Sequence, residues 1–140
     1  MQFTSSEESF IELLVAYMES EKRPNSIFIA GGFIRDKLLN KKPKDMDIIV
    51  TKKYYKHLST HLKKLSFKDK RIQLDKGKPA YGYGYPKNRD MFCLRFEGVE
   101  VEIRSFMEDL KTDLLTRDFT VNSLFYDLTD SKLIDLVGVR

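Results

Sequence analysis

The first twenty residues carry apolar side chains every three or four positions, a spacing that predicts an amphipathic helix. Ser5 followed three residues later by Glu8 indicates a capping box at the start of this helix. We expect the helix to end between Lys22 and Pro24, because proline cannot continue it. The apolar positions that define its buried face are Phe10, Ile11, Leu14, Val15 and Met18.

A short apolar run, Ser26–Ala30, stops at two glycines and is followed by apolar residues at helical spacing. This order predicts a strand, a glycine turn and a second helix that places Phe33, Ile34, Leu38 and Leu39 on one face. Asp45–Val50 first alternates between polar and apolar residues and then becomes wholly apolar. We therefore expect a strand whose first residues reach the edge of a sheet. A basic helix is expected over Tyr54–Leu65.

The second half of the chain reads mainly as β-structure. A short strand is expected over Arg71–Leu74, and alternation around a Glu-Gly pair predicts a β-hairpin of Met91–Phe96 with Val99–Phe106. A short helix over Met107–Leu115 and a last strand over Leu133–Leu136 complete the pattern. The predicted fold class is α/β (α+β), with a mixed, mostly antiparallel sheet and flanking helices.

Composition narrows the class of protein. With 140 residues, of which 41% are hydrophobic and 33% charged, the chain fits one domain, and its ten Phe and seven Tyr exclude a disordered protein. Cys93 is the single cysteine, so we expect no internal disulfide, and with only His57 and His61 beside it we expect no structural zinc site. No apolar stretch approaches the length of about 20 residues that spans a bilayer. We therefore expect a cytoplasmic protein without a membrane partner.

Positive charge is concentrated in one region of the chain. From Thr51 to Asp90, twelve Lys and Arg stand against three Asp, a balance of +9, so the remaining residues sum to 4 − 9 = −5. Such a block can bind a polyanion or form a solvated face. Tyr83 stands among glycines close to basic residues, a mixture able to stack on bases and neutralise phosphate. The candidate RNA-binding residues are Lys52, Lys53, Lys63, Lys64, Tyr83, Lys87 and Arg89.

Carboxylates on two predicted strands are the candidate metal ligands. Asp45 and Asp47 lie two positions apart, so both side chains project from one face of their strand. Oxygen-only ligands favour Mg²⁺ or Mn²⁺, and a shared carboxylate pair commonly holds two such ions in phosphoryl or nucleotidyl transfer. Glu102 on another strand offers a third carboxylate, while Glu100 and Arg104 project from the same face as Glu102. Solvent-facing acids on a hairpin are the alternative interpretation, and Glu100 competes with Glu102 for the third position.

The glycine turn is a candidate phosphate site. Gly31 and Gly32 separate a predicted strand from a helix, where the backbone can approach a phosphate closely. Arg35 lies one turn into this helix and points back toward its start, where it could meet the same phosphate. An ion pair with Asp36 is the structural alternative for this arginine.

Two ordered motifs together resemble a known family. The first, G-G-x-x-R-D-x-x-L-x5-D-x-D, runs over residues 31–47. The second, Thr-Arg-Asp-Phe-Thr-Val-Asn-Ser at 116–123, stands where the family carries Arg-Arg-Asp-x-Thr-x-Asn-Ala. The chain thereby resembles the class II tRNA nucleotidyltransferases (CCA-adding enzymes) and the bacterial poly(A) polymerases over residues 27–140. Thr116 and Ser123 depart from the family pattern. The segment Ser105–Leu115, between the third carboxylate and the second motif, is shorter than the flexible loop that the family carries there.

The resemblance implies a single catalytic head domain over residues 1–140, with a palm-like fold related to DNA polymerase β and without the family's neck, body and tail. It implies a metal-dependent transfer of NMP from an NTP (ATP and/or CTP) to an RNA or tRNA 3′ end. A helical partner or a second copy of the chain would then supply the missing segments, unless the sequence is a fragment. A non-catalytic nucleotide- or RNA-binding module is the alternative. The residues that the resemblance assigns to two Mg²⁺ or Mn²⁺ ions are Asp45, Asp47 and Glu102, and those it assigns to the nucleotide are Gly31, Gly32, Arg35, Arg117, Asp118 and Asn122.

Overall fold

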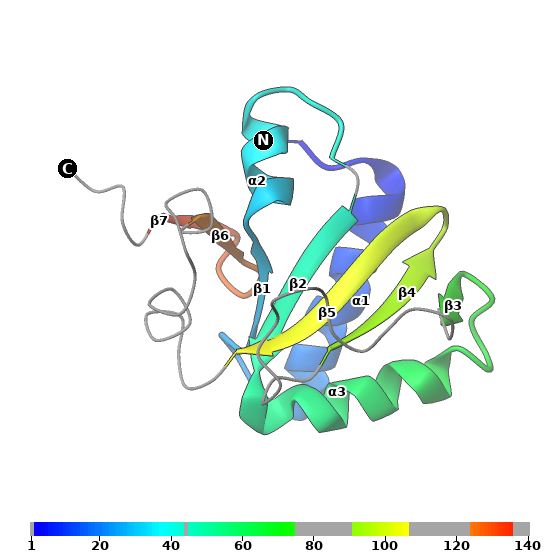
Figure 1. Cartoon of the computed structure of the whole chain (residues 1–140). Coiled ribbons are helices and arrows are strands. Elements are labelled where there is room, and N and C mark those ends of the chain that lie inside the picture. The colour runs from blue at the N-terminus through cyan, green and yellow to red at the C-terminus, as the bar shows by residue number, and fades with distance from the viewer. Residues whose placement is uncertain (1, 44, 75–90, 107–123, 136–140) are drawn as a thin grey trace.

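The computed structural model describes residues 2–43, 45–74, 91–106 and 124–135, and within these ranges the chain forms a seven-stranded sheet with helices against it (Figure 1). The helices are α1 (Ser5–Glu21), α2 (Gly32–Leu38) and α3 (Lys52–Leu65). The strands are β1 (Ile27–Ala30), β2 (Asp45–Thr51), β3 (Ile72–Leu74), β4 (Met91–Phe96), β5 (Val99–Phe106), β6 (Leu124–Asp127) and β7 (Lys132–Asp135). None of the helices in these ranges has the length and apolar composition needed to cross a lipid bilayer.

The strand order of the sheet is β3-β4-β5-β2-β1-β6-β7. Strands β2 and β5 pair in parallel, and the other neighbouring strands of the described sheet pair antiparallel. The predicted mixed, mostly antiparallel sheet is therefore confirmed. The predicted helix before residue 65 begins two residues earlier than expected, and β7 begins one residue earlier. Strand β6 had no prediction, and the helix expected over 107–115 lies outside the described residues.

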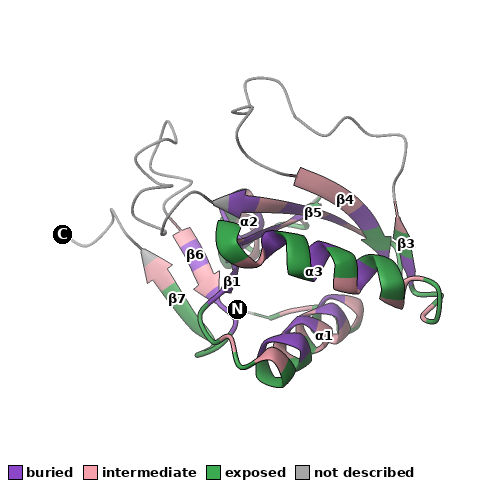
Figure 2. Ribbon diagram, turned by 90° about the horizontal axis from the view of Figure 1, so that it is seen from below, coloured by how far each residue is buried: buried purple, intermediate pink, exposed green. Residues whose placement is uncertain are grey.

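Two apolar clusters lie on opposite faces of the sheet. The larger one fills the space between the sheet and helices α1 and α3, which lie on the same side of it (Figure 2). Phe10 of α1 contacts Phe96 of β4 there with a ring separation of 5.1 Å, and the two helices meet where the Tyr17 hydroxyl lies 2.6 Å from His57 Nδ1. The smaller cluster, on the other face, contains Phe28, Ala30, Ile49 and Phe125.

Strand β2 contributes to both clusters by strict alternation. Met46, Ile48 and Val50 belong to the larger cluster, whereas Ile49 belongs to the smaller one. Successive side chains of a strand point to opposite faces. The two aspartates of β2 therefore share the face of Ile49, which we call the open face because neither α1 nor α3 covers it.

The capping box of α1 lies one residue earlier in the chain than the sequence predicted. Thr4 is the N-cap: its hydroxyl accepts a hydrogen bond from the Glu7 amide at 3.1 Å, and Glu7 Oε1 accepts one from the Thr4 amide at 2.8 Å. The predicted Ser5–Glu8 capping box is thus wrong. Both registers satisfy the sequence pattern, but only Glu7 points inward, where its carboxylate also binds Lys37 Nζ at 2.6 Å. Glu8 is exposed.

The turn between β1 and α2 depends on a glycine. Gly31 adopts φ 61° and ψ −126°, a conformation that side chains disfavour, and its amide donates to the Leu124 carbonyl at 3.0 Å. The predicted order of strand, glycine turn and helix is confirmed. The predicted core face of α2 is correct for Phe33 and Ile34 only, because Leu38 and Leu39 at the end of this short helix are exposed.

Candidate active site

The parallel pairing of β2 with β5 brings the predicted carboxylates together on the open face. Asp45 is the register partner of Glu100, and Asp47 is the register partner of Glu102. Register partners on adjacent strands project from the same face, and neighbouring strands lie about 4.8 Å apart. Asp45, Asp47 and Glu102 therefore share one small area of the sheet, with Glu100 at its margin beside Asp45.

Arginines of β4 and β5 pair with two of these carboxylates. Arg104 on β5 reaches Asp47 through two hydrogen bonds, Nε to Oδ1 at 3.0 Å and Nη2 to Oδ2 at 2.6 Å. The side chain of Arg104 is 11% exposed and that of Asp47 is 27% exposed, so this bidentate pair is partly shielded from solvent. Arg95 on β4 pairs with Glu100 at 2.7 Å in a more exposed position.

These pairs determine the local charge. Four carboxylates (Asp45, Asp47, Glu100 and Glu102) and two guanidinium groups (Arg95 and Arg104) leave −4 + 2 = −2 on this part of the open face. The protein as a whole carries +4. The described residues thus create a local negative site whose charge matches that of a divalent cation.

The described side chains of the open face are not arranged around a metal position in this structure. Within the described ranges, no group of three or more His, Cys, Asp and Glu side chains is arranged to hold a metal ion. Both oxygens of Asp47 contact Arg104 instead. The donor chemistry of Asp45, Asp47 and Glu102 fits Mg²⁺ or Mn²⁺, since all donors are carboxylate oxygens. An ion bound to Asp47 would share these oxygens with Arg104, and the two positive charges would repel each other.

Sequence reasoning placed Arg104 on the face of Glu102 but gave it no role. Its spacing two residues after Glu102 was the available signal, because alternate residues share a face. The partner, Asp47, could not be identified before the register of β2 against β5 was known. The same register information places Cys93 of β4 opposite Glu102, so the thiol also projects from the open face, where it is half-buried.

The glycine turn lies beside this site. Strand β1 pairs antiparallel with β2, with Ile29 opposite Ile48, so the end of β1 runs next to the beginning of β2. Arg35 pairs with Asp36 at 3.1 Å, which is the structural alternative considered for this residue. Its Nη2 atom also lies 3.7 Å from the position that a Cβ on Gly32 would occupy. The guanidinium group therefore remains over the glycine turn, as its place in the helix predicted.

The remaining candidate residues divide into two groups. Lys52, Lys53, Lys63 and Lys64 are exposed on α3, which starts at the end of β2 opposite to Asp45 and runs from there toward β3 (Figure 1). Six others lie outside the described residues: Tyr83, Lys87, Arg89, Arg117, Asp118 and Asn122.

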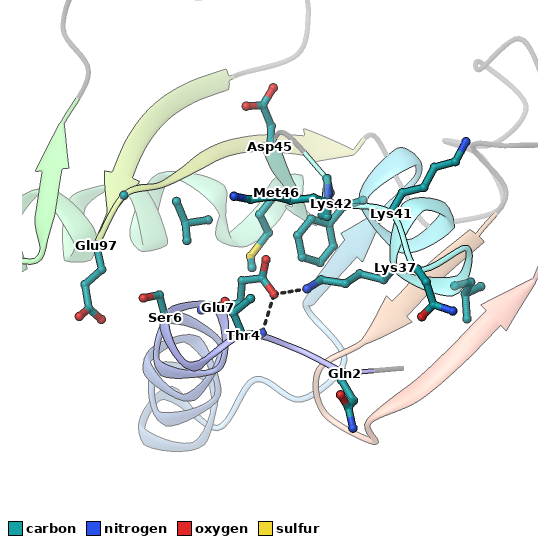
Figure 3. A pocket seen from close by; sticks show the side chains of 16 residues that line it. Gln2, Thr4, Ser6, Glu7, Lys37, Lys41, Lys42, Asp45, Met46 and Glu97 are labelled. Atoms are coloured by element: carbon teal, nitrogen blue, oxygen red, sulfur yellow. Dashed lines mark hydrogen bonds and ion pairs between the residues drawn. The ribbon is translucent and has the colours of Figure 1, made fainter.

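A cavity of about 720 Å³ adjoins Asp45 on the side of α1 and α2 (Figure 3). Lys37 enters it from α2 and pairs with Glu7 of α1, both side chains being about nine-tenths buried. The charged residues that line the cavity are balanced in number, with Lys37, Lys41 and Lys42 against Glu7, Asp45 and Glu97. The cavity therefore carries no excess charge that would select an anion or a cation.

Comparison with known protein families identifies the family of this chain. The family described as "Poly A polymerase head domain" matches residues 27–139, which is most of the chain. The chain belongs to this poly(A) polymerase head-domain family. The matched region contains the open-face carboxylates and the glycine turn, whereas α1 and its Glu7 precede it. A search of curated proteins found no match.

Solved structures show the same head fold. One described as "tRNA-processing enzyme (apo form I)" gives a TM-score of 0.70 at 23% identity and covers 99% of this chain and 34% of its own. A Thermotoga maritima CCA-adding enzyme complexed with tRNA gives 0.66 at 23% identity, covering 97% and 30%. A tRNA nucleotidyltransferase with a primer tRNA and an incoming ATP analogue gives 0.63 at 24% identity, covering 89% and 34%. The chain thus spans about a third of the length of those proteins and has the nucleotidyltransferase fold.

Proposed function

We propose that this domain transfers a nucleoside monophosphate from an NTP to the terminal hydroxyl of an RNA and releases pyrophosphate. The observation that carries the proposal is the β2–β5 register, which brings Asp47 beside Glu102 with Asp45 on the same face, in a chain of the poly(A) polymerase head-domain family. In this reaction the acceptor oxygen bonds to the α-phosphorus. The bond from that phosphorus to the β-phosphate oxygen breaks, and pyrophosphate leaves with the electron pair while the hydroxyl proton passes to water.

Asp45, Asp47 and Glu102 would hold the Mg²⁺ or Mn²⁺ ions, two in number by the family resemblance. Ions bound there lower the pKa of the acceptor hydroxyl and neutralise charge on the triphosphate. The protein's own part is to keep the three carboxylates on one rigid face of adjacent strands. The register places Glu102 beside Asp47 and Glu100 beside Asp45, and the family resemblance assigns the third position to Glu102.

The nucleotide would lie between the carboxylates and the glycine turn. Gly31 and Gly32 leave room for phosphate oxygens near the backbone, and Arg35 supplies a positive charge above Gly32. By the family resemblance, Arg117, Asp118 and Asn122 would hold the triphosphate and the ribose. Related proteins were solved with CTP and with an ATP analogue, so ATP and CTP are the nucleotides to test first.

The acceptor is proposed to be an RNA 3′ end, because related proteins were solved with tRNA and because α3 carries five lysines without an acid. The proposal places the protein in the cytoplasm. A helical protein or a second copy of the chain is the proposed protein partner of this domain. Sedimentation of the purified protein with and without RNA measures whether such a complex forms.

One observation favours a second candidate, a non-catalytic nucleotide- or RNA-binding module. Arg104 already supplies a positive charge to both oxygens of Asp47, and so does in part what a metal ion would do there. In a binding module this ion pair would be permanent. In a transferase Asp47 would have to bind a metal ion beside Arg104 or in its place.

The deciding experiment is nucleotide incorporation. The purified protein is incubated with Mg²⁺ or Mn²⁺, one labelled NTP at a time, and a pool of RNA acceptors, including tRNA without its 3′ end. We expect extension that decreases about a hundredfold or more in Asp45→Asn, Asp47→Asn and Glu102→Gln, because metal ions contribute several kcal/mol to such reactions. Glu100→Gln is the matched control on the same face, with an expected change of less than about fivefold.

Absence of extension with every acceptor, together with metal-independent NTP binding, would reject the transferase in favour of the binding module. Undiminished extension in Asp45→Asn would reject the assigned carboxylates instead.

A further inference from the structure

A groove of about 580 Å³ follows the outer face of α3 and is lined almost entirely by basic residues. The side chains that carry the argument are Arg23, Lys53, Lys56, His57, His61 and Lys64, and we call this surface the α3 groove. Arg23 enters from the segment after α1, and the others come from α3. Figure 2 shows the outer face of α3 as largely exposed, alongside α1.

The charge of this groove is one-sided. Its lining contains four permanent cations and no Asp or Glu. Glu21 lies nearby, but it faces His57 Nε2 at 3.4 Å. The larger cavity beside Asp45 differs, since each of its lysines is matched by an acid in the same lining. The α3 groove is therefore the better anion-attracting surface of the two.

Two of the four permanent cations, Arg23 and Lys53, contact an aromatic ring. The Arg23 guanidinium carbon lies 4.1 Å from the centre of the Tyr54 ring, and Lys53 Nζ lies 5.7 Å from the same ring. Cation–π contacts of this kind reduce the freedom of long side chains. His57 is fixed by the Tyr17 hydroxyl at 2.6 Å. The groove is thus more ordered than a set of unconstrained surface lysines.

The shape of the groove favours a chain of phosphates over a single anion. Lys53, Lys56 and Lys64 lie on one helix face, and eleven residues separate the first from the last, a length of about 16 Å. A compact anion would contact one or two of these cations. A stacked strand, with a rise of about 3.4 Å per nucleotide, would place about five phosphates along the row.

We propose that the α3 groove binds the phosphate backbone of the RNA acceptor, several nucleotides away from the reacting end and without reading bases. This inference rests on the proposed function for the identity of the polyanion. Helix α3 starts where β2 ends, and β2 extends for about 20 Å from Asp45. An acceptor must therefore exceed about six nucleotides before it reaches both the carboxylates and the groove.

The test measures RNA binding without catalysis. Anisotropy of a labelled 20-nucleotide single-stranded RNA is recorded against protein concentration at several NaCl concentrations, in EDTA and without NTP. The groove variant combines Lys53→Gln, Lys56→Gln and Lys64→Gln. The matched control removes the same charge from exposed lysines elsewhere, by Lys68→Gln, Lys70→Gln and Lys132→Gln.

We expect the slope of log affinity against log salt to decrease by about 2 in the groove variant, since each lost phosphate contact on a single strand removes about 0.7. The control variant should keep the wild-type slope. Equal slopes in the two variants, or no RNA binding by the wild type in 50 mM NaCl, would overturn the inference. Displacement of the RNA by polyglutamate of equal charge concentration would overturn its assignment to a nucleic acid in favour of an acidic protein.

Incorporation assays separate this inference from the proposed function. The groove variant should extend a 4-nucleotide acceptor at the wild-type rate and a 20-nucleotide acceptor with a raised KM. If the wild type extends no acceptor but its RNA binding still depends on the groove lysines, the proposed transferase function is rejected and the RNA-binding role of the groove stands. If the groove variant and the wild type have equal KM values for the 20-nucleotide acceptor, the RNA-binding role of the groove is rejected and the proposed transferase function stands.

Discussion

Arg104 has a position in which it competes directly with any metal ion at Asp47. Its guanidinium group donates to both oxygens of that carboxylate and is nine-tenths buried. Buried charges are stable only when they are paired. The arginine therefore stabilises Asp47 in the protein without metal, and the same contact raises the free-energy cost of metal binding.

This competition predicts the effect of Arg104→Gln. We expect Mn²⁺ to bind about tenfold more tightly, because a unit charge close to the metal position is removed, and we expect the free energy of unfolding without metal to decrease by about 1 to 2 kcal/mol. Electron paramagnetic resonance of free Mn²⁺ measures the first quantity, and urea titration measures the second.

Arg95→Gln is the matched control, because it removes the same charge from the same face. Its guanidinium group is 52% exposed, so solvent and salt screen it, and we expect less than about a threefold change in Mn²⁺ affinity. Equal effects of the two substitutions would show that Mn²⁺ affinity depends only on the overall charge of this face and not on the contact between Arg104 and Asp47.

Residue spacing identified the acids of this face but not their partners. A period of two places Asp45 with Asp47, and Glu102 with Arg104, on common faces. The contact between Arg104 and Asp47 depends on the parallel register of strands that are 57 residues apart at these positions. No local pattern contains that information.

At the start of α1 the sequence offers two possible capping boxes, and a contact with another helix determines which one forms. Thr4–Glu7 and Ser5–Glu8 both have the spacing of a capping box, and the structure uses the first because Glu7 also binds Lys37 of α2. The carboxylate thereby joins the two helices at the cavity wall (Figure 3).

Substitutions at the two candidate caps should differ in effect. Thr4→Ala removes an acceptor for the Glu7 amide, so we expect the free energy of unfolding to decrease by about 1 kcal/mol. Ser5→Ala should change it by less than about 0.5 kcal/mol, since Ser5 is exposed and already lies within the helix. Urea titrations of the two variants measure both values. A larger effect at Ser5 would restore the register predicted from sequence.

Helix α3 contains a group with a shifted pKa. Burial is the main cause that lowers the pKa of His61, and His57 lowers it further, while Glu21 acts in the opposite direction. The His61 ring also packs on the Tyr17 ring at 4.9 Å. Because the unfolded chain takes up this proton at a higher pH than the folded protein, the stability that His61 contributes is complete above its ordinary pKa of 6.5 and is lost as the pH falls below that value.

The His61→Gln variant should therefore have a flatter dependence of stability on pH between 7.5 and 5 than the wild type. Urea titrations at several pH values across this range provide the comparison. Parallel curves for the two proteins would mean that His61 has the same pKa in the folded and unfolded states.

At the scale of the whole molecule, the sheet separates two surfaces of opposite charge. The open face carries −2 near its carboxylates, and the α3 groove carries four permanent cations along a helix on the other side of the sheet. The sequence already indicated this division, since the basic block from Thr51 to Asp90 is balanced by an acidic remainder.

The fold class followed from local patterns, whereas the order of the strands did not. Alternation and turn residues predicted β2, β4 and β5 nearly to their ends. They left β6 without a prediction, although it pairs with β1 beside the glycine turn. The family motifs supplied the connection between these pieces, since they imply a known arrangement.

The position of Cys93 has a practical consequence. It is the chain's only thiol, and as the register partner of Glu102 it lies about 5 Å from the backbone position that bears this carboxylate. A small alkylating reagent would therefore modify a single atom, next to the proposed site, without any engineered substitution. The rate of that modification, followed by mass spectrometry as ligands are added, reports occupancy of the open face directly and does not depend on turnover.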